Sequence, residues 1–171
     1  MNAGIESKPG AVKNRTTVER ESDREVVVTR TINGPARLVF EAFTKAELLR
    51  RWWVPRSMGM NLLSCEVDAR VGGKYRLVFD HSPEPVAFFG TYVEVQPYSR
   101  LAWTNEEGGE DGSVTTVTFE EKDGKTLLVL RETYKSKEAL DAAGRGAADA
   151  MVETFAQLDE LIAALGEGSP Q

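Results

Sequence analysis

The chain has 171 residues, of which 41% are apolar and 28% charged, a balance that is ordinary for one globular domain. Its 27 acidic and 21 basic side chains give a net charge of -6, so no excess of positive charge exists to neutralise a phosphate backbone, and we expect no nucleic-acid partner. No run approaches the roughly 20 apolar residues that a membrane span needs, and the N-terminus has no apolar signal-peptide core. We therefore predict a cytoplasmic protein without a membrane span.

Composition divides the chain into a tail and a single domain. The first 22 residues hold too few apolar side chains to offset the entropy cost of ordering them. We predict a disordered tail over residues 1–22, a folded domain over 23–166 and a flexible C-terminus over 167–171.

The domain is expected to begin with a strand and short helices. The segment from Arg24 to Ile32 is rich in β-branched residues and partly alternating, which indicates the first strand. Pro35 suits the first turn of a helix, and the apolar residues after it recur at helical spacing. We predict one or two short helices that end before Pro55.

The middle of the chain changes to a period of two, with turn signals about every ten residues, which predicts antiparallel strands. Asp123 and Gly124 tolerate the positive φ angles of a tight turn, so the last two strands are expected to form a hairpin. The six strands expected here cover residues 61–68, 73–81, 86–95, 99–105, 113–121 and 125–134.

The C-terminal part returns to helical spacing. Ser136 is the expected N-cap and Gly166 the expected stop of a long helix with one apolar stripe. Gly144 and Gly146 each weaken helix propensity by about 1 kcal/mol relative to Ala, so we expect a bend or restart there. The firm part of the helix is predicted over residues 147–165.

The order of these elements predicts an α+β fold in which a curved seven-stranded antiparallel sheet wraps around the long C-terminal helix. A twisted sheet of this size curls, and one helix on its concave face leaves space toward one end. We expect that space to be a pocket, with the short helices as its lid.

Five segments of the chain carry a family resemblance. In order, they read RRWWVP, CEVDARVGGKYRLVF, FGTYVEVQPYSRLAWT, VTFEEKDGKTLLVLRETY and AMVETFAQLDELIAAL. Together they resemble the bacterial homologues of the heat-shock-protein ATPase activator, a branch of the SRPBCC or START-like superfamily, over about residues 24 to 165. The resemblance implies the helix-grip fold and a role in binding a small hydrophobic ligand such as a lipid, an aromatic compound or a polyketide-like molecule.

The resemblance leaves other functions open. Some members of the superfamily are cyclases or hydroxylase subunits, so an enzyme of the cyclase or dehydratase type using the same cavity is the main alternative. Such an enzyme would draw on His81, Tyr75, Tyr92 or Arg131, and we assign no catalytic residue. Co-chaperone activity is discounted, because the eukaryotic activator also uses an N-terminal domain that we do not expect here; a chaperone contact through the shared domain and a homodimer remain open.

The candidate ligand-binding residues are the inward aromatic and apolar side chains of the helices and strands. We expect one of the two adjacent tryptophans to anchor the short helices to the sheet and the other to stand at the pocket mouth. For every residue of the set, a place in the solid core is the competing interpretation. The set comprises Trp52, Trp53, Tyr75, Leu77, Phe79, His81, Phe89, Trp103, Phe119, Ala147, Met151 and Phe155.

The sequence contains no pattern typical of a metal site or a cofactor site. His81 is the single histidine and Cys65 the single cysteine, too few for a zinc site or an internal disulfide. Gly72-Gly73 is expected to be a turn, since no phosphate-binding motif follows it. We expect no metal and no cofactor, and a small hydrophobic molecule as the partner.

Overall fold

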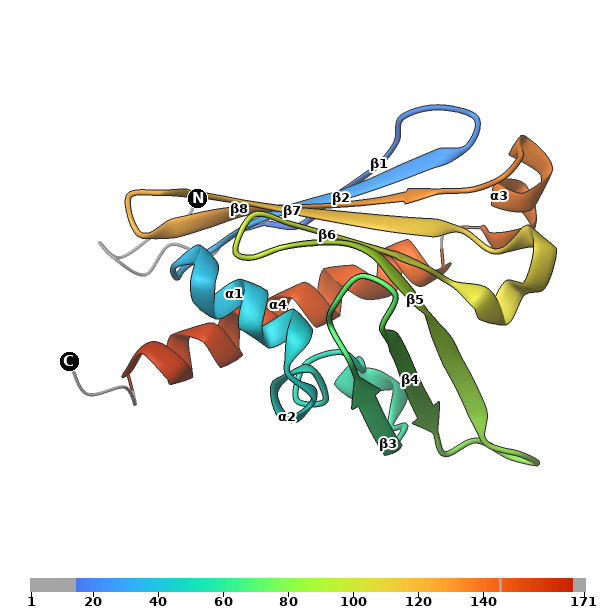
Figure 1. Cartoon of the computed structure of the whole chain (residues 1–171), viewed down its shortest axis with the longest axis horizontal. Coiled ribbons are helices and arrows are strands. Elements are labelled where there is room, and N and C mark those ends of the chain that lie inside the picture. The colour runs from blue at the N-terminus through green and yellow to red at the C-terminus, as the bar shows by residue number, and fades with distance from the viewer. Residues whose placement is uncertain (1–14, 145, 168–171) are drawn as a thin grey trace, which may run out of the picture.

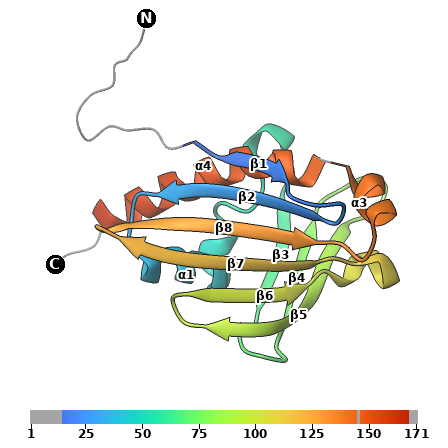
Figure 2. The same ribbon diagram turned by 90° about the horizontal axis from the view of Figure 1, so that it is seen from above.

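The structure, a computed structural model, describes residues 15–144 and 146–167. One antiparallel sheet of eight strands has the order β1-β2-β8-β7-β6-β5-β4-β3. Figure 2 shows β1, β2, β8, β7, β6 and β5 side by side from above. The strands are β1 (Thr17–Arg20), β2 (Glu25–Ile32), β3 (Leu62–Val67), β4 (Lys74–Phe79), β5 (Val86–Gln96), β6 (Arg100–Thr104), β7 (Val114–Lys122) and β8 (Lys125–Thr133).

The helices lie mainly on one side of this sheet. Figure 1 shows α4 running beneath the strands, with α1 beside it, while β3, β4 and β5 bend down at one end. This arrangement confirms the predicted α+β helix-grip fold. The helices are α1 (Ala36–Thr44), α2 (Ala46–Leu49), α3 (Lys137–Ala143) and α4 (Gly146–Glu167), and the short 3-10 segments are η1 (Arg56–Met58) and η2 (Glu106–Asp111).

The bend in the sheet passes through β5. The first half of β5, residues 86–91, pairs with β4, and the second half, from Tyr92 on, pairs with β6 with a register shift between Tyr92 and Glu94. Gly90 lies at the corner, where an added Cβ would come within 1.7 Å of the carbonyl oxygen of Thr104. Only glycine leaves room for β5 and the end of β6 to approach this closely.

The N-terminal prediction needs a correction, because the sheet has eight strands instead of seven. The extra strand, β1, lies inside the segment predicted as a tail and pairs antiparallel with β2 over residues 17–20. Pairing satisfies the backbone groups of β1 that face β2, and Val18 packs against the core. Residues 1–14 of the predicted tail lie outside the described residues, as do residues 168–171 of the predicted C-terminus.

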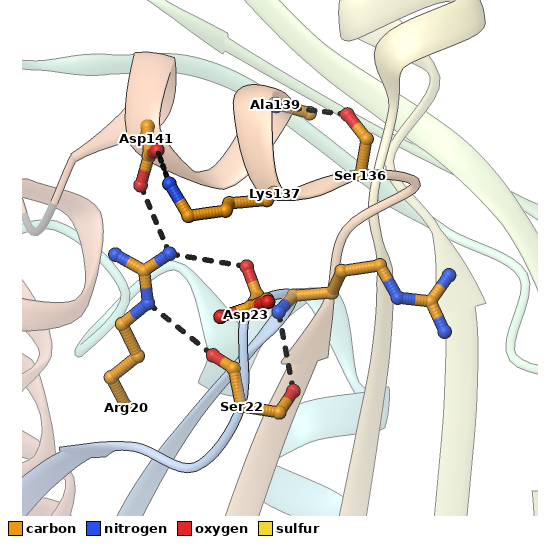
Figure 3. Close-up of polar contacts among 8 residues, drawn as sticks. Arg20, Ser22, Asp23, Ser136, Lys137, Ala139 and Asp141 are labelled. Carbon is orange, nitrogen blue, oxygen red and sulfur yellow. Dashed lines mark hydrogen bonds and ion pairs between the residues drawn. The ribbon is translucent and has the colours of Figure 1, made fainter.

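Polar contacts connect the β1–β2 turn to α3 (Figure 3). Arg20 Nη2 lies 2.9 Å from Asp141 Oδ1, and Lys137 Nζ donates to Asp141 Oδ2 at 2.9 Å. Arg20 also donates to the backbone carbonyls of Ser22 and Asp23. The segment before β2 therefore holds the short helix that follows β8.

The predicted interruption of the C-terminal helix is present. Ser136 caps α3 by accepting a hydrogen bond from the backbone N–H of Ala139 at 3.0 Å. Gly144 then adopts a positive φ of 68° and ends α3, and α4 begins at Gly146. The expected hairpin is also confirmed, since Asp123 and Gly124 have φ values of 56° and 78° between β7 and β8.

No helix in the described ranges, residues 15–144 and 146–167, is long and apolar enough to cross a membrane. In the same ranges, no group of three or more His, Cys, Asp or Glu side chains could hold a metal ion.

Candidate functional site

A cavity of about 420 Å3 opens between the bent end of the sheet, α3, α4 and the segment that follows α2. Its walls come from elements far apart in the sequence. The lining residues are Trp53, Val54, Pro55, Met58, Met60, Phe79, Phe88, Trp103, Asn105, Glu107, Gly112, Ser113, Thr115, Glu132, Tyr134, Ala139, Ala143, Ala150, Met151 and Thr154.

Most of the wall is apolar and aromatic. Phe79 and Phe88 contact each other edge to face, with ring centroids 5.3 Å apart, and Trp53 and Trp103 do so at 6.5 Å. Met58 and Phe88 are 57% and 39% exposed, so they mark the opening to solvent. An apolar molecule that enters would exchange water for these side chains.

Helix α4 positions the segment that carries much of the apolar wall. Gln157 is buried, and its side-chain amide donates to the carbonyls of Trp52 and Val54 and accepts from the backbone N–H of Arg56. Glu153 accepts from the backbone N–H and the hydroxyl of Ser57 at 3.0 and 2.6 Å. These contacts satisfy backbone groups of an irregular segment and fix it beside the cavity.

The two adjacent tryptophans have different surroundings. Trp52 is 1% exposed, and its Nε1 donates to the carbonyl of Ala42 at 2.9 Å, so it anchors the segment after α2 to α1. Trp53 is partly exposed and lines the cavity. One side chain is therefore an anchor and the other part of the wall.

A polar cluster joins β6, β7 and β8 on the cavity wall, with Asn105 at its centre. The Asn105 side-chain oxygen accepts from Tyr75 OH at 2.9 Å and from Trp103 Nε1 at 3.2 Å. Its nitrogen donates to Thr115 Oγ1 at 2.8 Å and to Ser113 Oγ at 3.0 Å. The amide of Asn105 thereby uses both its acceptor and its donors, and it holds neighbouring side chains in fixed orientations.

Glu132 completes the cluster as an ionisable group. Ser113 Oγ donates to Glu132 Oε2 at 3.2 Å. Burial raises the pKa of Glu132 above its ordinary value, the hydrogen bond from Ser113 opposes this, and the negative charge of Glu107 adds to the rise. A carboxyl group that favours its neutral form in this way can donate as well as accept a hydrogen bond.

The structure brings four of the sequence-predicted site residues together in the wall, namely Trp53, Phe79, Trp103 and Met151. Tyr75 and Leu77 line a separate void of about 20 Å3 that shares Trp53 and Trp103 with the main cavity. Trp52, Phe119 and Phe155 are buried in the core.

The remaining candidates lie elsewhere. His81 is exposed beyond the end of β4. Phe89 pairs with the exposed Arg76, so its side chain lies on the outer face of β5, and its neighbour Phe88 takes the inward place. Ala147 belongs to α4, but its side chain is outside the described ones.

The residues suggested from the sequence for an enzyme are also placed away from the main cavity. Arg131 forms an ion pair with Glu21 on the outer surface, and Tyr92 is buried without reaching the main cavity. The polar groups that do line it, Asn105, Ser113 and Glu132 among them, were not predicted.

Comparison with known proteins identifies the family. A family model described as activator of Hsp90 ATPase homolog 1-like protein matches residues 33–163. The chain belongs to this family. No curated protein matches it.

Solved structures of bacterial proteins share the fold of this Hsp90 ATPase activator homolog 1-like domain. A protein from Rhodobacter sphaeroides is 24% identical with a TM-score of 0.77, and the match covers 88% of this chain and 99% of that one. A protein from Nitrosomonas europaea is 20% identical with a TM-score of 0.76, covering 86% and 99%. A Staphylococcus aureus protein described as of unknown function is 20% identical with a TM-score of 0.66, covering 91% and 98%. At these identities the likeness shows the fold alone.

Proposed function

We propose that this protein binds a small, mostly apolar molecule in the cavity between the sheet and α4. The observation that carries the proposal is the cavity itself. Its volume of about 420 Å3 lies within the roughly 300–1,000 Å3 of small-molecule sites. A few polar groups in an apolar wall are also the usual composition of such sites.

The wall suggests how a ligand would be held. The aromatic and aliphatic side chains around Trp53, Phe79 and Met151 would supply most of the affinity by excluding water from the ligand. Asn105 is occupied by its own hydrogen bonds, whereas Glu132, which accepts one hydrogen bond from Ser113, would orient a polar group of the ligand. Binding without catalysis needs no other groups.

The test is to identify what the purified protein carries. Native mass spectrometry of the full chain is expected to show an added mass that disappears on denaturation, and extraction would identify the molecule. In parallel, N-phenyl-1-naphthylamine, an uncharged aromatic probe, should gain fluorescence with saturable binding. A protein that shows neither an added mass nor saturable probe binding would refute the proposal.

An enzyme that uses the same cavity is the second candidate, and Glu132 is the observation that favours it. Its carboxyl group lines an apolar cavity, and burial raises its pKa, which is the direction that general acid catalysis by a carboxyl group requires. Once the co-purifying molecule is known, its conversion by wild-type protein but not by Glu132→Gln would support this function. Unchanged ligand after prolonged incubation would leave binding alone.

A further inference from the structure

The cavity wall carries charge of one sign. Its lining includes the acidic residues Glu107 and Glu132, and no Lys, Arg or His side chain lines it within residues 15–144 and 146–167. A ligand with an anionic group would bring like charges together in a poorly solvated space, which costs free energy. A ligand with a cationic group would meet the opposite charge.

The geometry of Glu132 leaves it ready for such a partner. Asn105 Nδ2 donates to Ser113 Oγ at 3.0 Å, so the hydroxyl proton of Ser113 is directed to Glu132 Oε2. In the described part of the chain, Glu132 accepts this hydrogen bond and forms no ion pair with Lys or Arg. The Glu132 side chain lines the cavity, and within the described residues its other oxygen, Oε1, accepts no hydrogen bond.

Burial and the nearby carboxylates both act on two tyrosines beside the cavity. The pKa of Tyr134, which lines the cavity, is raised to about 12 by burial and by the negative charge of Glu132. Burial and the charges of Glu107, Tyr92, Glu106 and Glu132 also raise the pKa of Tyr75.

The aromatic part of the wall favours a cation as well. Trp53, Trp103, Phe79 and Phe88 line the cavity, and the faces of such rings attract ammonium groups, more strongly when water is excluded. Carboxylate and aromatic faces together are a recognisable environment for an amine.

We infer that the cavity selects an apolar amine, with its protonated nitrogen at Glu132 and its hydrocarbon part against the aromatic and aliphatic wall. This inference rests on the proposed binding function and adds the chemical class of the ligand. A neutral alcohol of the same length keeps the apolar contacts and loses the ion pair. A carboxylate of the same length keeps those contacts and meets Glu107 and Glu132.

The test compares three molecules with one hydrocarbon chain: decylamine, decan-1-ol and decanoate, each below its aggregation concentration at pH 7.5. Each competes with N-phenyl-1-naphthylamine for the full-length protein. Decylamine is expected to displace the probe at a concentration at least tenfold below that of decanoate, with decanol between them. In Glu132→Gln, the ratio of the displacing concentration of decanol to that of decylamine should fall at least fivefold. The displacing concentration of decanol itself should stay within about twofold of its wild-type value.

A matched control removes a surface charge instead. Glu19 lies exposed on β1, away from the cavity, and Glu19→Gln lowers the net negative charge by the same amount as Glu132→Gln. Glu19→Gln should keep the preference for decylamine, whereas its loss there would assign the preference to overall charge and overturn the inference. Decanoate binding as tightly as decylamine in the wild type, or an unchanged preference in Glu132→Gln, would also overturn it and leave apolar binding intact. Failure of the probe and of all three competitors to bind would refute the proposed function itself.

Discussion

Filling the cavity from α4 gives the sharpest test of whether it is a binding site. Met151 lines the cavity and is only partly buried. Met151→Trp adds the volume of a few methylene groups, which is small beside a cavity of about 420 Å3. We therefore expect the variant to fold with the Tm of the wild type, while the indole ring takes up space that the bound probe needs and weakens binding of N-phenyl-1-naphthylamine.

The size of the change in Tm distinguishes an open cavity from a solid core. Extra methylene groups in a well-packed interior cost about 1–3 kcal/mol. For a chain of this size each kcal/mol lowers Tm by about 2–4 °C, so overpacking would lower it by roughly 2–12 °C. A thermal melt and a probe titration on the same sample therefore distinguish the two situations.

Two further tryptophan variants on the same helix calibrate the result. Leu158 is 0% exposed in the core, so Leu158→Trp should show the full cost of overpacking. Val152 is 44% exposed, so Val152→Trp should leave both Tm and probe binding unchanged. If Met151→Trp loses stability like Leu158→Trp, or if it binds the probe as tightly as the wild type, the cavity is not the binding site that we propose.

Three other changes test the structure. Deleting residues 1–22 removes β1 and the ion pair of Arg20 with Asp141, and we expect Tm to fall by about 2–8 °C. Deleting residues 1–14 keeps the β1–β2 pairing and this ion pair, so it serves as the control. Gly90→Ala places a Cβ against the Thr104 carbonyl, and we expect the free energy of unfolding to fall by at least the usual overpacking limit of about 3 kcal/mol. Denaturant unfolding measures this change, and an unfolding midpoint equal to that of the wild type would contradict the close approach. The raised pKa of Glu132 means that the folded protein holds this proton to higher pH than the unfolded chain, so ionisation removes stability as pH rises above the unfolded value of about 4.3. The Tm of Glu132→Gln minus the Tm of the wild type should therefore increase from pH 4 to pH 8. A difference in Tm that stays constant over this range would refute this prediction.

Local pattern was enough to predict most of the sheet. The strand predicted over residues 125–134 is observed as Lys125–Thr133, and the strand predicted over 73–81 as Lys74–Phe79. Both are bounded by turn residues and alternate in burial, so short-range sequence determines them. The break between α3 and α4 followed for the same reason from Gly144 and Gly146.

Strand β1 could not be predicted by the same reasoning. Its four residues, TVER, lie in a charged segment whose average composition is typical of disorder. Pairing with the edge of β2 and the contact of Arg20 with Asp141, which is far away in sequence, order it. Composition averaged over a window cannot report a contact of this kind.

The inward place of Glu132 was, in contrast, contained in the sequence. Because side chains alternate along a strand, Glu132 shares its face with Leu128 and Leu130, both 0% exposed. The Asp-Gly hairpin sets the register that places Glu132 opposite Thr115, on the face of Val117 and Phe119. Counting outward from the turn would have predicted a carboxyl group on the inner face of the sheet.

The position of Glu132 is informative because side chains on the buried face of a strand are usually apolar. A carboxyl group in line with buried leucines lowers stability unless it is neutral, hydrogen-bonded or paired with a cation. Ser113 supplies one hydrogen bond, and the described part of the chain supplies no cation, so the ionised form of Glu132 is incompletely compensated by the fold alone. Departures of this kind are expected where a site serves function over stability. A cationic ligand in the adjacent cavity would supply the missing compensation, which is why we place the amine at Glu132.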